Sequence, residues 1–278
     1  MDLGIFAKTF SGRSLGEALD AVAGSGIRSI QFNMSLTGGP SLPDEITAGT
    51  AGDVQGAVAA RELKMAAVSG TYNMAHPDPA QRALGGARLA TLIEAAPALG
   101  TRVVTLCTGS RDPEDMWRSH PDNTTAEAWR DSIEQIGQAL AVAERHGVIL
   151  AFEPEYNNVV ADATAARRLL DEMGSDSLRV VIDAANLILP GELHRQTATL
   201  KQAFELLGAS LVLAHAKDVR PDGSIVPAGQ GGLDYRLYVQ LLVEAGYDGP
   251  LVMHGLPESD VPTASEYLRG YISEAPAR

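Results

Sequence analysis

The sequence predicts an α/β protein built as one (β/α)₈ TIM barrel with a parallel eight-stranded sheet, on three observations. Short apolar runs alternate with segments of helical periodicity, and this alternation occurs eight times in 278 residues. The apolar runs are continuous, which is typical of parallel strands buried on both faces. Eight strand–helix units in a chain of this length match the size of a (β/α)₈ barrel. We expect residues 1–278 to form a single domain, because no Gly/Pro-rich linker divides them.

Apolar runs indicate the expected strands and helices, and capping residues and glycines indicate where helices begin and end. Ser14 is placed to cap the first helix, which Gly24 ends, and Gly147 and Gly174 end two later helices. The strands are expected at 3–6, 27–32, 65–70, 102–107, 148–152, 178–183, 211–215 and 250–254. The helices are expected at 14–24, 53–63, 79–99, 124–145, 162–173, 192–207, 234–245 and 262–272, with a break in the third near Pro97.

Composition and charge narrow the choice of partners and location. The net charge of −13 argues against nucleic acid, since phosphate contacts need a basic face, and against an anionic membrane surface. Cys107 is the one cysteine, so no intrachain disulfide is possible, and its apolar strand favours a buried thiol. The chain start shows no signal-peptide pattern, and no apolar run reaches the ~20 residues of a membrane helix. We expect a cytoplasmic protein.

Four residues of metal-ligand type each close an apolar strand. They are Glu153, Asp183, His215 and His254, at intervals of 30, 32 and 39 residues, each long enough for one strand–helix unit. The carboxyl ends of barrel strands carry the catalytic groups, and a carboxylate there is costly unless it is paired, protonated or metal-bound. Two carboxylates and two imidazoles suit one divalent ion, Mn²⁺ first, with Fe²⁺, Co²⁺, Ni²⁺ or Zn²⁺ as alternatives to it and Ca²⁺ disfavoured.

Each of these residues also has a purely structural interpretation. Glu153 would pair with Lys217 at the rim, and Asp183 would cap the next helix. Taken alone, either histidine would be a satisfied polar side chain. An open doubly wound sheet is the alternative fold, but it would not spread ligands over four consecutive strands, and residues 10–13 lack the Gly-rich first turn typical of that fold.

The motifs at these strand ends resemble the xylose-isomerase-like (β/α)₈ superfamily, in its sugar isomerase/epimerase branch. The resemblance covers essentially the whole chain. The branch includes ketose 3-epimerases, inosose isomerases and dehydratases, and hydroxypyruvate isomerases. The matching segments are Leu150-Ala151-Phe152-Glu153, Val181-Ile182-Asp183, His215-Ala216-Lys217-Asp218, which is similar to the family's H-x-K-D, and Gly229-Gln230-Gly231 before Leu233-Asp234. These motifs are specific for the fold and the metal site and not for the substrate.

His254 departs from the family pattern. The resemblance implies a glutamate as fourth ligand on strand eight, which would exchange protons with the glutamate of strand five across the substrate carbon. An imidazole can bind a metal or act as a base, but a symmetric two-carboxylate epimerisation is put in doubt. A lyase or dehydratase outcome on a keto-sugar or inosose therefore gains weight. Glu258 would replace the missing carboxylate if it reached the site; otherwise it is an exposed residue before the last helix.

The resemblance implies a divalent-metal-dependent isomerase or epimerase that acts on a sugar-like hydroxy-carbonyl compound through enediolate chemistry. Glu153 is the first candidate for the base, with His254 and Glu155 as alternatives. The residues expected to bind the substrate are His76, Trp117, Glu155, Asn186, Lys217 and Gln230. Trp117 and His120 lie in the long loop 108–123, where an aromatic side chain would pack on the apolar face of a sugar.

The sequence also bears on whether the substrate is phosphorylated and on two rival functions. A non-phosphorylated substrate is favoured, although Arg111 or the loop at Gly229 would be available to a phosphate. A DNA-repair endonuclease of the same superfold would need a basic face and a histidine cluster, which six histidines and the net charge disfavour. A non-catalytic sugar-binding barrel is the minor alternative. The family that the chain resembles is often dimeric or tetrameric, so the resemblance is compatible with a homo-oligomer without setting its size.

Overall fold

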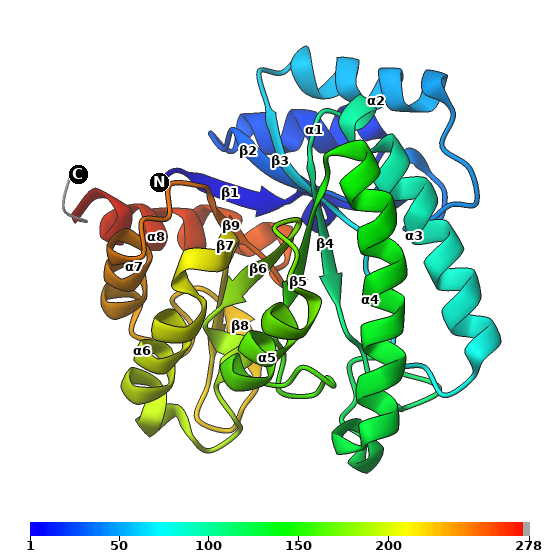
Figure 1. Ribbon diagram of the computed structural model, residues 1–278. Coiled ribbons are helices and arrows are strands. Elements are labelled where there is room, and N and C mark those ends of the chain that lie inside the picture. Colours follow the sequence, from blue (N-terminus) through cyan, green and yellow to red (C-terminus); the bar gives the residue numbers. More distant parts are fainter. Residues whose placement is uncertain (275–278) are drawn as a thin grey trace.

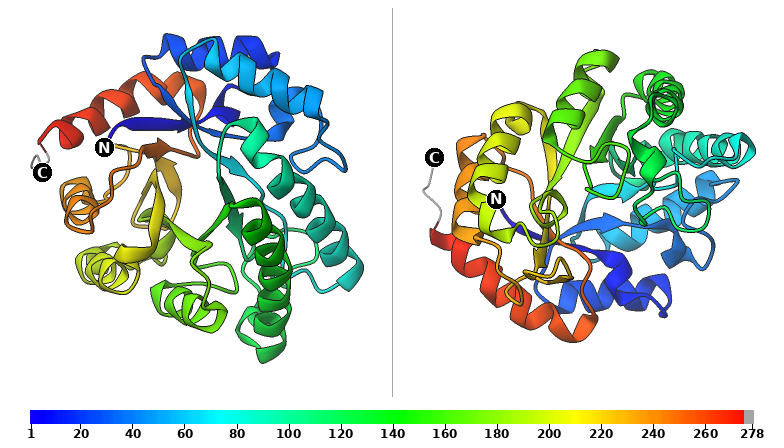
Figure 2. Two further views of the ribbon diagram at one scale, coloured as in Figure 1. Left: turned by 45° about the horizontal axis from the view of Figure 1, so that its top comes forward. Right: turned by 90° about the horizontal axis from the view of Figure 1, so that it is seen from below.

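Eight parallel strands close into a ring in the computed structural model, which describes residues 1–274 (Figures 1 and 2). β1 pairs with both β2 and β9, and β6 pairs with β7, so that the ring has no open edge between its first and last strands. The strands of the ring are β1 Leu3–Phe6, β2 Ser29–Phe32, β3 Lys64–Ser69, β4 Val103–Cys107, β5 Ile149–Glu153, β6 Leu178–Asp183, β7 Leu211–Val219 and β9 Leu251–Met253. The predicted (β/α)₈ barrel is confirmed.

The helices surround this ring, as the left view of Figure 2 shows. They are α1 Leu15–Gly24, α2 Ala48–Ala59, α3 Pro79–Leu99, α4 Ala126–His146, α5 Ala163–Met173, α6 Gln196–Leu207, α7 Tyr235–Glu244 and α8 Val261–Glu274. Short 3-10 helices lie in the connections between strands and helices: η1 Ala7–Phe10, η2 Met34–Thr37, η3 Pro121–Thr124, η4 Ala185–Leu187, η5 Leu193–Arg195, η6 Gly208–Ser210 and η7 Glu258–Asp260. Ser14 forms a capping box with Glu17 at the start of α1, and Gly147 ends α4 at a φ of 62°.

Some predicted boundaries are wrong. α2 begins at Ala48 rather than near residue 53, because the Thr47 side chain accepts a hydrogen bond from the amide of Thr50 and caps the helix there. α3 continues through Pro97. Proline removes one amide donor, and in the last turn of the helix this loss is small. β8 (Ile225–Pro227) was not predicted; it pairs antiparallel with the extended end of β7.

The interior of the ring is closed by one apolar layer. Ala67, Ala151, Val181, Leu213 and Val252 form this buried cluster, one from each of β3, β5, β6, β7 and β9. Side chains two residues apart on a strand point to the same face. The residues two positions further on are Ser69, Glu153, Asp183, His215 and His254. The strand-end residues predicted from the sequence therefore stand on this layer, inside the mouth of the barrel.

No helix within residues 1–274 has the length and apolar character needed to cross a membrane.

Candidate active site

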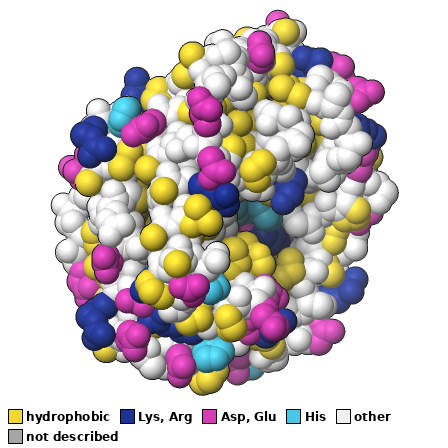
Figure 3. All heavy atoms as spheres, turned by 90° about the vertical axis from the view of Figure 1, so that its right-hand side faces the viewer, with side chains coloured by type: hydrophobic (Ala, Val, Ile, Leu, Met, Phe, Trp, Pro, Cys, Tyr) yellow, Lys and Arg dark blue, Asp and Glu magenta, His cyan; other side chains and the backbone are white. Residues whose placement is uncertain are grey.

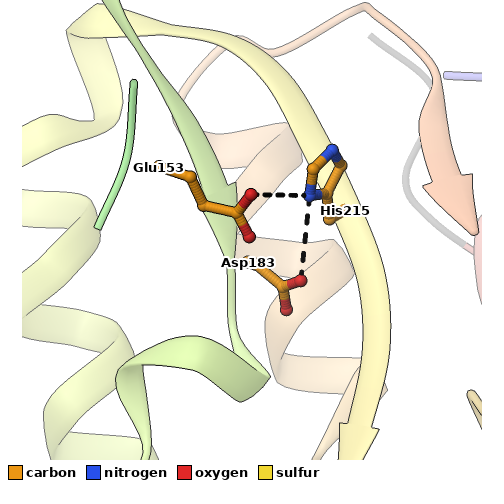
Figure 4. Close-up of side chains that lie close together, drawn as sticks. All are labelled: Glu153, Asp183 and His215. Atoms are coloured by element: carbon orange, nitrogen blue, oxygen red, sulfur yellow. Dashed lines mark ion pairs between the residues drawn. The ribbon is translucent and has the colours of Figure 1, made fainter. Parts of the chain in front are cut away.

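Glu153 and Asp183 end β5 and β6, and His215 lies in the middle of β7, paired with Asp183, so that the three side chains meet (Figure 4). Nδ1 of His215 lies 3.2 Å from Oε2 of Glu153 and 3.8 Å from Oδ2 of Asp183. One ligand atom from each residue lies within 4.8 Å of the other two. All three side chains are buried, so the two carboxylates and the imidazole interact with little screening by water.

Gln31, at the end of β2, orients His215. The Oε1 atom of Gln31 lies 2.7 Å from Nε2 of His215, and the Gln31 amide donates in turn to the Thr105 hydroxyl at 3.2 Å. With an amide oxygen as its partner, Nε2 carries the proton, and Nδ1 keeps its lone pair. That lone pair faces two carboxylates and has no hydrogen-bond partner within residues 1–274.

Lys217 brings a positive charge into the same cluster. Its Nζ atom lies 3.0 Å from Oδ2 of Asp183 and 3.4 Å from Oε1 of Glu153. Asn186 also donates a hydrogen bond of 2.6 Å to Oε1 of Glu153. Of the two structural interpretations considered for the carboxylates, the pairing of Glu153 with Lys217 is present. Asp183 accepts a hydrogen bond from the amide of Ala185 and does not cap a helix.

Burial and neighbouring charge set the protonation of the cluster. Burial opposes ionisation of Glu153, but the Lys217 ammonium holds its pKa well below the usual range of a carboxyl. Burial raises the pKa of Asp183 despite the nearby ammonium. Burial would lower the pKa of Lys217, but Asp183 and Glu153 raise it above that of a free lysine. Burial, and then the charge of Glu153, raises the pKa of Glu155 to about 8.

His254, directly after β9, lies in a stack of rings. Its centroid is 4.6 Å from that of Phe6, with the planes 7° apart, and 4.8 Å from that of His215, with the planes 23° apart. Burial, followed by the charge of Lys217, lowers the pKa of His254 well below that of a free imidazole. Its Nδ1 atom is buried and has no hydrogen-bond partner in the described part of the chain. His254 is not part of the three-residue group that brings its ligand atoms together.

A cavity of about 580 Å³ opens above this cluster. Figure 3 shows a hollow with histidine and Lys/Arg side chains in its depth and hydrophobic side chains around its mouth. Of the residues predicted to act on the substrate, the cavity is lined by Glu153, His254, Trp117, Glu155, Asn186 and Lys217. Asp183 lies beneath it, against Lys217.

Two predicted substrate-binding residues lie away from the cavity. His76 lines a separate, smaller hollow, and its ring bridges the Pro113 carbonyl and the amide of Asp78 at 3.2 and 3.0 Å. Gln230 donates to the exposed carboxylate of Asp260. Glu258 pairs with Arg13 on the surface at 2.9 Å, so it does not supply the carboxylate that strand eight lacks.

The loop after β4 carries Trp117 and is anchored by three asparagines. The Asn73 side chain bonds the backbone of Ser110 in both directions. Asn123 accepts from the amide of Arg111 at 2.7 Å and donates to the carbonyl of Asn157. Asn158 accepts from the amide of Gly109. Arg111 itself is buried against Asp131, at 2.7 Å, so it is not available to a phosphate in the cavity.

Asp218 fixes the glycine-rich loop that follows β7. Its carboxylate accepts hydrogen bonds from the amides of Val219, Gly229 and Leu233. A Cβ atom on Gly231 would overlap the Asp218 carboxylate, which explains the glycine at that place. Asp218 in the H-x-K-D segment therefore shapes the loop, while His215 and Lys217 of the same segment enter the cluster.

Sequence reasoning missed several residues of the site. Gln31 is the most informative, because it is a lone amide in the apolar run Ile30-Gln31-Phe32 at a strand end, the signal that identified the other four. Met116, Tyr156 and Ile225 also line the cavity. They come from loops and from β8, whose course a periodicity argument does not predict.

The donor set fits a divalent cation. The two buried carboxylates and the imidazole lone pair on Nδ1 face one another, an arrangement that is repulsive without a positive charge between them. Gln31 is the outer-shell partner that a ligating histidine usually has on its second nitrogen. In this structure the Lys217 ammonium supplies part of the positive charge. Glu153, Asp183 and His215 form a possible three-residue metal site.

Comparisons with known proteins agree with this architecture. The sequence model of the family described as the xylose isomerase-like TIM barrel matches residues 19–271. In a search of curated proteins, no sequence matches the chain.

Solved structures with the same fold share little sequence with the chain. A D-tagatose 3-epimerase-like protein has a TM-score of 0.78 at 16% identity, over 99% of this chain and 98% of that one. An IolI protein structure with a zinc atom has a TM-score of 0.75 at 16% identity, over 99% and 97%. The 3-keto-D-glucoside 4-epimerase of E. coli has a TM-score of 0.73 at 17% identity, over 97% and 99%. At these identities the likeness shows the fold.

Proposed function

Because the chain belongs to the xylose isomerase-like TIM barrel family, we propose that it is a divalent-metal-dependent isomerase or epimerase of a sugar-like hydroxy-carbonyl compound. The observation that carries this proposal is the lone pair on Nδ1 of His215, held by Gln31 so that it faces the carboxylates of Glu153 and Asp183. Solved structures of the same fold include sugar epimerases and a zinc-containing protein, which supports the choice of chemistry.

Glu153, Asp183 and His215 would hold the metal, and His254 stands next to them as a further nitrogen. A bound divalent ion supplies Lewis-acid polarisation of a carbonyl and its neighbouring hydroxyl. Mn²⁺ remains the first expectation, because the set mixes carboxylate oxygen with imidazole nitrogen.

The chain's own residues supply binding and proton transfer. Glu153 is ionised, lines the cavity and would take the proton from the carbon next to the carbonyl. Asn186 and Lys217 hold its Oε1 atom, which leaves Oε2 to face the cluster. Lys217 would also stabilise negative charge that develops on a substrate oxygen. His254, stacked on His215, offers a ring nitrogen without a hydrogen-bond partner among the described residues as the second group for proton exchange.

One observation favours a lyase as the second candidate function. β9 ends in His254 and not in a carboxylate, and the nearest carboxylate after it, Glu258, pairs with Arg13. Epimerisation needs a base on one face of the carbon and a proton donor on the opposite face, whereas in elimination the proton that one base removes can be passed to the hydroxyl group, which leaves as water. A dehydratase acting on a keto-sugar or inosose would therefore use Glu153 without a symmetric partner.

Solvent isotope exchange tests the proposal. The Mn²⁺-loaded protein is incubated in D₂O with ketoses, inososes and 3-keto-glucosides, and products are followed by NMR. We expect deuterium at a carbon next to the carbonyl together with an isomer, an epimer or an elimination product. Glu153→Gln should abolish the exchange, while Glu258→Gln, a surface carboxylate, should leave it intact. The absence of exchange with every compound would contradict the proposal.

A further inference from the structure

The cavity has a polar floor and an apolar mouth. Its floor is formed by Glu153, His215 and Lys217, and its mouth includes Met116, Trp117 and Ile225. A volume of about 580 Å³ lies in the range of pockets that enclose drug-sized ligands, roughly 300–1,000 Å³. A single sugar ring bound at the floor would leave the mouth unfilled.

Two side chains at this mouth are unusually exposed for their type. Within residues 1–274, four large hydrophobic side chains are exposed, and two of them line this cavity: Trp117 at 47% and Ile225 at 38%. Exposed apolar groups that gather at the entrance of a polar site mark a binding surface rather than a packing defect. Leu84, which is exposed to 45%, lies in a separate hollow.

The backbone at Trp117 and at Ile225 is held in place by hydrogen bonds. The amide of Trp117 donates to the Asp115 side chain at 2.9 Å, and Asp112 accepts from the amides of Glu114 and Asp115. Ile225 begins β8 and is paired with Val219 of β7. The apolar mouth is therefore built by two separate elements that hold it open, and a ligand group placed there would lose little to ordering of the protein.

The charges of the cavity favour an uncharged group over a phosphate at this mouth. Among the described residues that line it, the cations are Lys8 and Lys217, and no arginine is present. Lys217 is already engaged by Asp183 and Glu153. A phosphate would also meet the negative charge of Glu153, so an uncharged group fits the mouth better.

We propose that the substrate is a glycoside whose sugar unit carries a ketone on the ring, with that unit over the carboxylate cluster and an apolar aryl or alkyl aglycone at the mouth beside Trp117 and Ile225. This inference rests on the proposed function and deepens it, because it assigns the substrate class as a substituted sugar rather than a free monosaccharide or a sugar phosphate.

Calorimetric titration tests the aglycone subsite without turnover. Phenyl β-D-glucopyranoside and methyl β-D-glucopyranoside are titrated into the Mn²⁺-loaded protein. Burying the phenyl group should make the dissociation constant of the phenyl glycoside lower by about tenfold or more. Trp117→Ala and Ile225→Ser should each bring the ratio of the two constants towards one, and Leu84→Ser should leave it unchanged.

Several results would overturn the aglycone subsite. These are equal affinities in the wild type, a ratio that survives both mouth substitutions, or no binding of either glycoside. If Trp117→Ala lowered the affinity for both glycosides equally, the indole would contact the sugar ring and not the aglycone, which would also overturn the aglycone subsite. Failure of the proposed function is read separately, from metal content and deuterium exchange, because this titration requires no reaction.

Discussion

The side-chain oxygen of Gln31 lies 2.7 Å from Nε2 of His215 and fixes which nitrogen of that ring faces Glu153 and Asp183. The two residues come from β2 and β7, far apart in the sequence. A lone pair on Nδ1 can exist only while Nε2 keeps its proton, and the amide oxygen of Gln31 favours that tautomer.

Removal of the Gln31 amide should therefore weaken metal binding. Gln31→Leu takes away the acceptor for Nε2–H, and loss of such an outer-shell partner typically costs about 10- to 100-fold in metal affinity. Calorimetric titration with Mn²⁺ measures the change. Gln31→Glu, which retains an acceptor, should recover most of the affinity, and Gln135→Leu, a buried glutamine bonded to Tyr72, serves as the control. An affinity unchanged in Gln31→Leu would show that the amide does not orient the ligand.

Replacement of Lys217 should make stability depend on metal. Lys217→Met leaves Glu153 and Asp183 buried without their ammonium, and breaking a buried ion pair costs about 3–5 kcal/mol of unfolding free energy. A divalent ion should then restore more stability than it gives the wild type, because it no longer competes with Nζ. Thermal unfolding with and without Mn²⁺ measures both effects. Lys8→Met, on the exposed rim of the cavity, is the control. If Lys217→Met had the same stability and the same response to Mn²⁺ as Lys8→Met, the metal and Nζ of Lys217 would not share one site.

The Asn123 side chain should prove necessary for the loop that carries Trp117. It makes three hydrogen bonds, to the Ser110 hydroxyl, the Arg111 amide and the Asn157 carbonyl. Asn123→Ala leaves buried polar groups unpaired, and we expect a loss of about 1–3 kcal/mol of unfolding free energy in urea. Thr124→Ala, on the adjacent exposed residue, should change stability by less than about 0.5 kcal/mol. Equal effects of the two substitutions would contradict an anchoring role for Asn123.

Cys107 should be unreactive in the folded protein. Burial raises the pKa of its thiol well above that of a free cysteine, so little thiolate exists at pH 8, and the thiolate is the reactive form. Iodoacetamide should leave the native, metal-free protein unmodified and label it in urea, as mass spectrometry would show. Labelling of the native thiol at a rate similar to that in urea would contradict the buried position.

The sequence was sufficient to predict the barrel and the four strand-end residues, because both depend on strand periodicity. Glu153 and Asp183 end neighbouring strands of one parallel ring, and His215 lies opposite Asp183 on the next strand, which runs on to Val219 instead of ending there as predicted. The three side chains converge for this reason. The ring of His254 also reaches the cavity, but its stacking between Phe6 and His215 depends on side-chain torsions that spacing does not specify.

The remaining differences concern loops and isolated polar residues. His76 and Gln230 bond to their own surroundings instead of lining the cavity, because the direction of a loop depends on contacts such as that of Gln230 with Asp260. Gln31 was overlooked since one amide in an apolar strand has no motif around it. Ile225 belongs to β8, whose pairing with β7 follows from the folded loop.

The central claim is that Glu153, Asp183 and His215 form one metal site, and metal content measures it most directly. The protein is purified without added metal, reconstituted with Mn²⁺ and desalted, and its metal content is measured by inductively coupled plasma mass spectrometry. The His215→Ala and His254→Ala variants are treated in the same way. The account predicts about one ion per chain in the wild type, loss of the ion in His215→Ala, and weakened retention in His254→Ala. A wild type that holds no divalent ion after reconstitution would contradict it and leave Lys217 as the cation of the cluster.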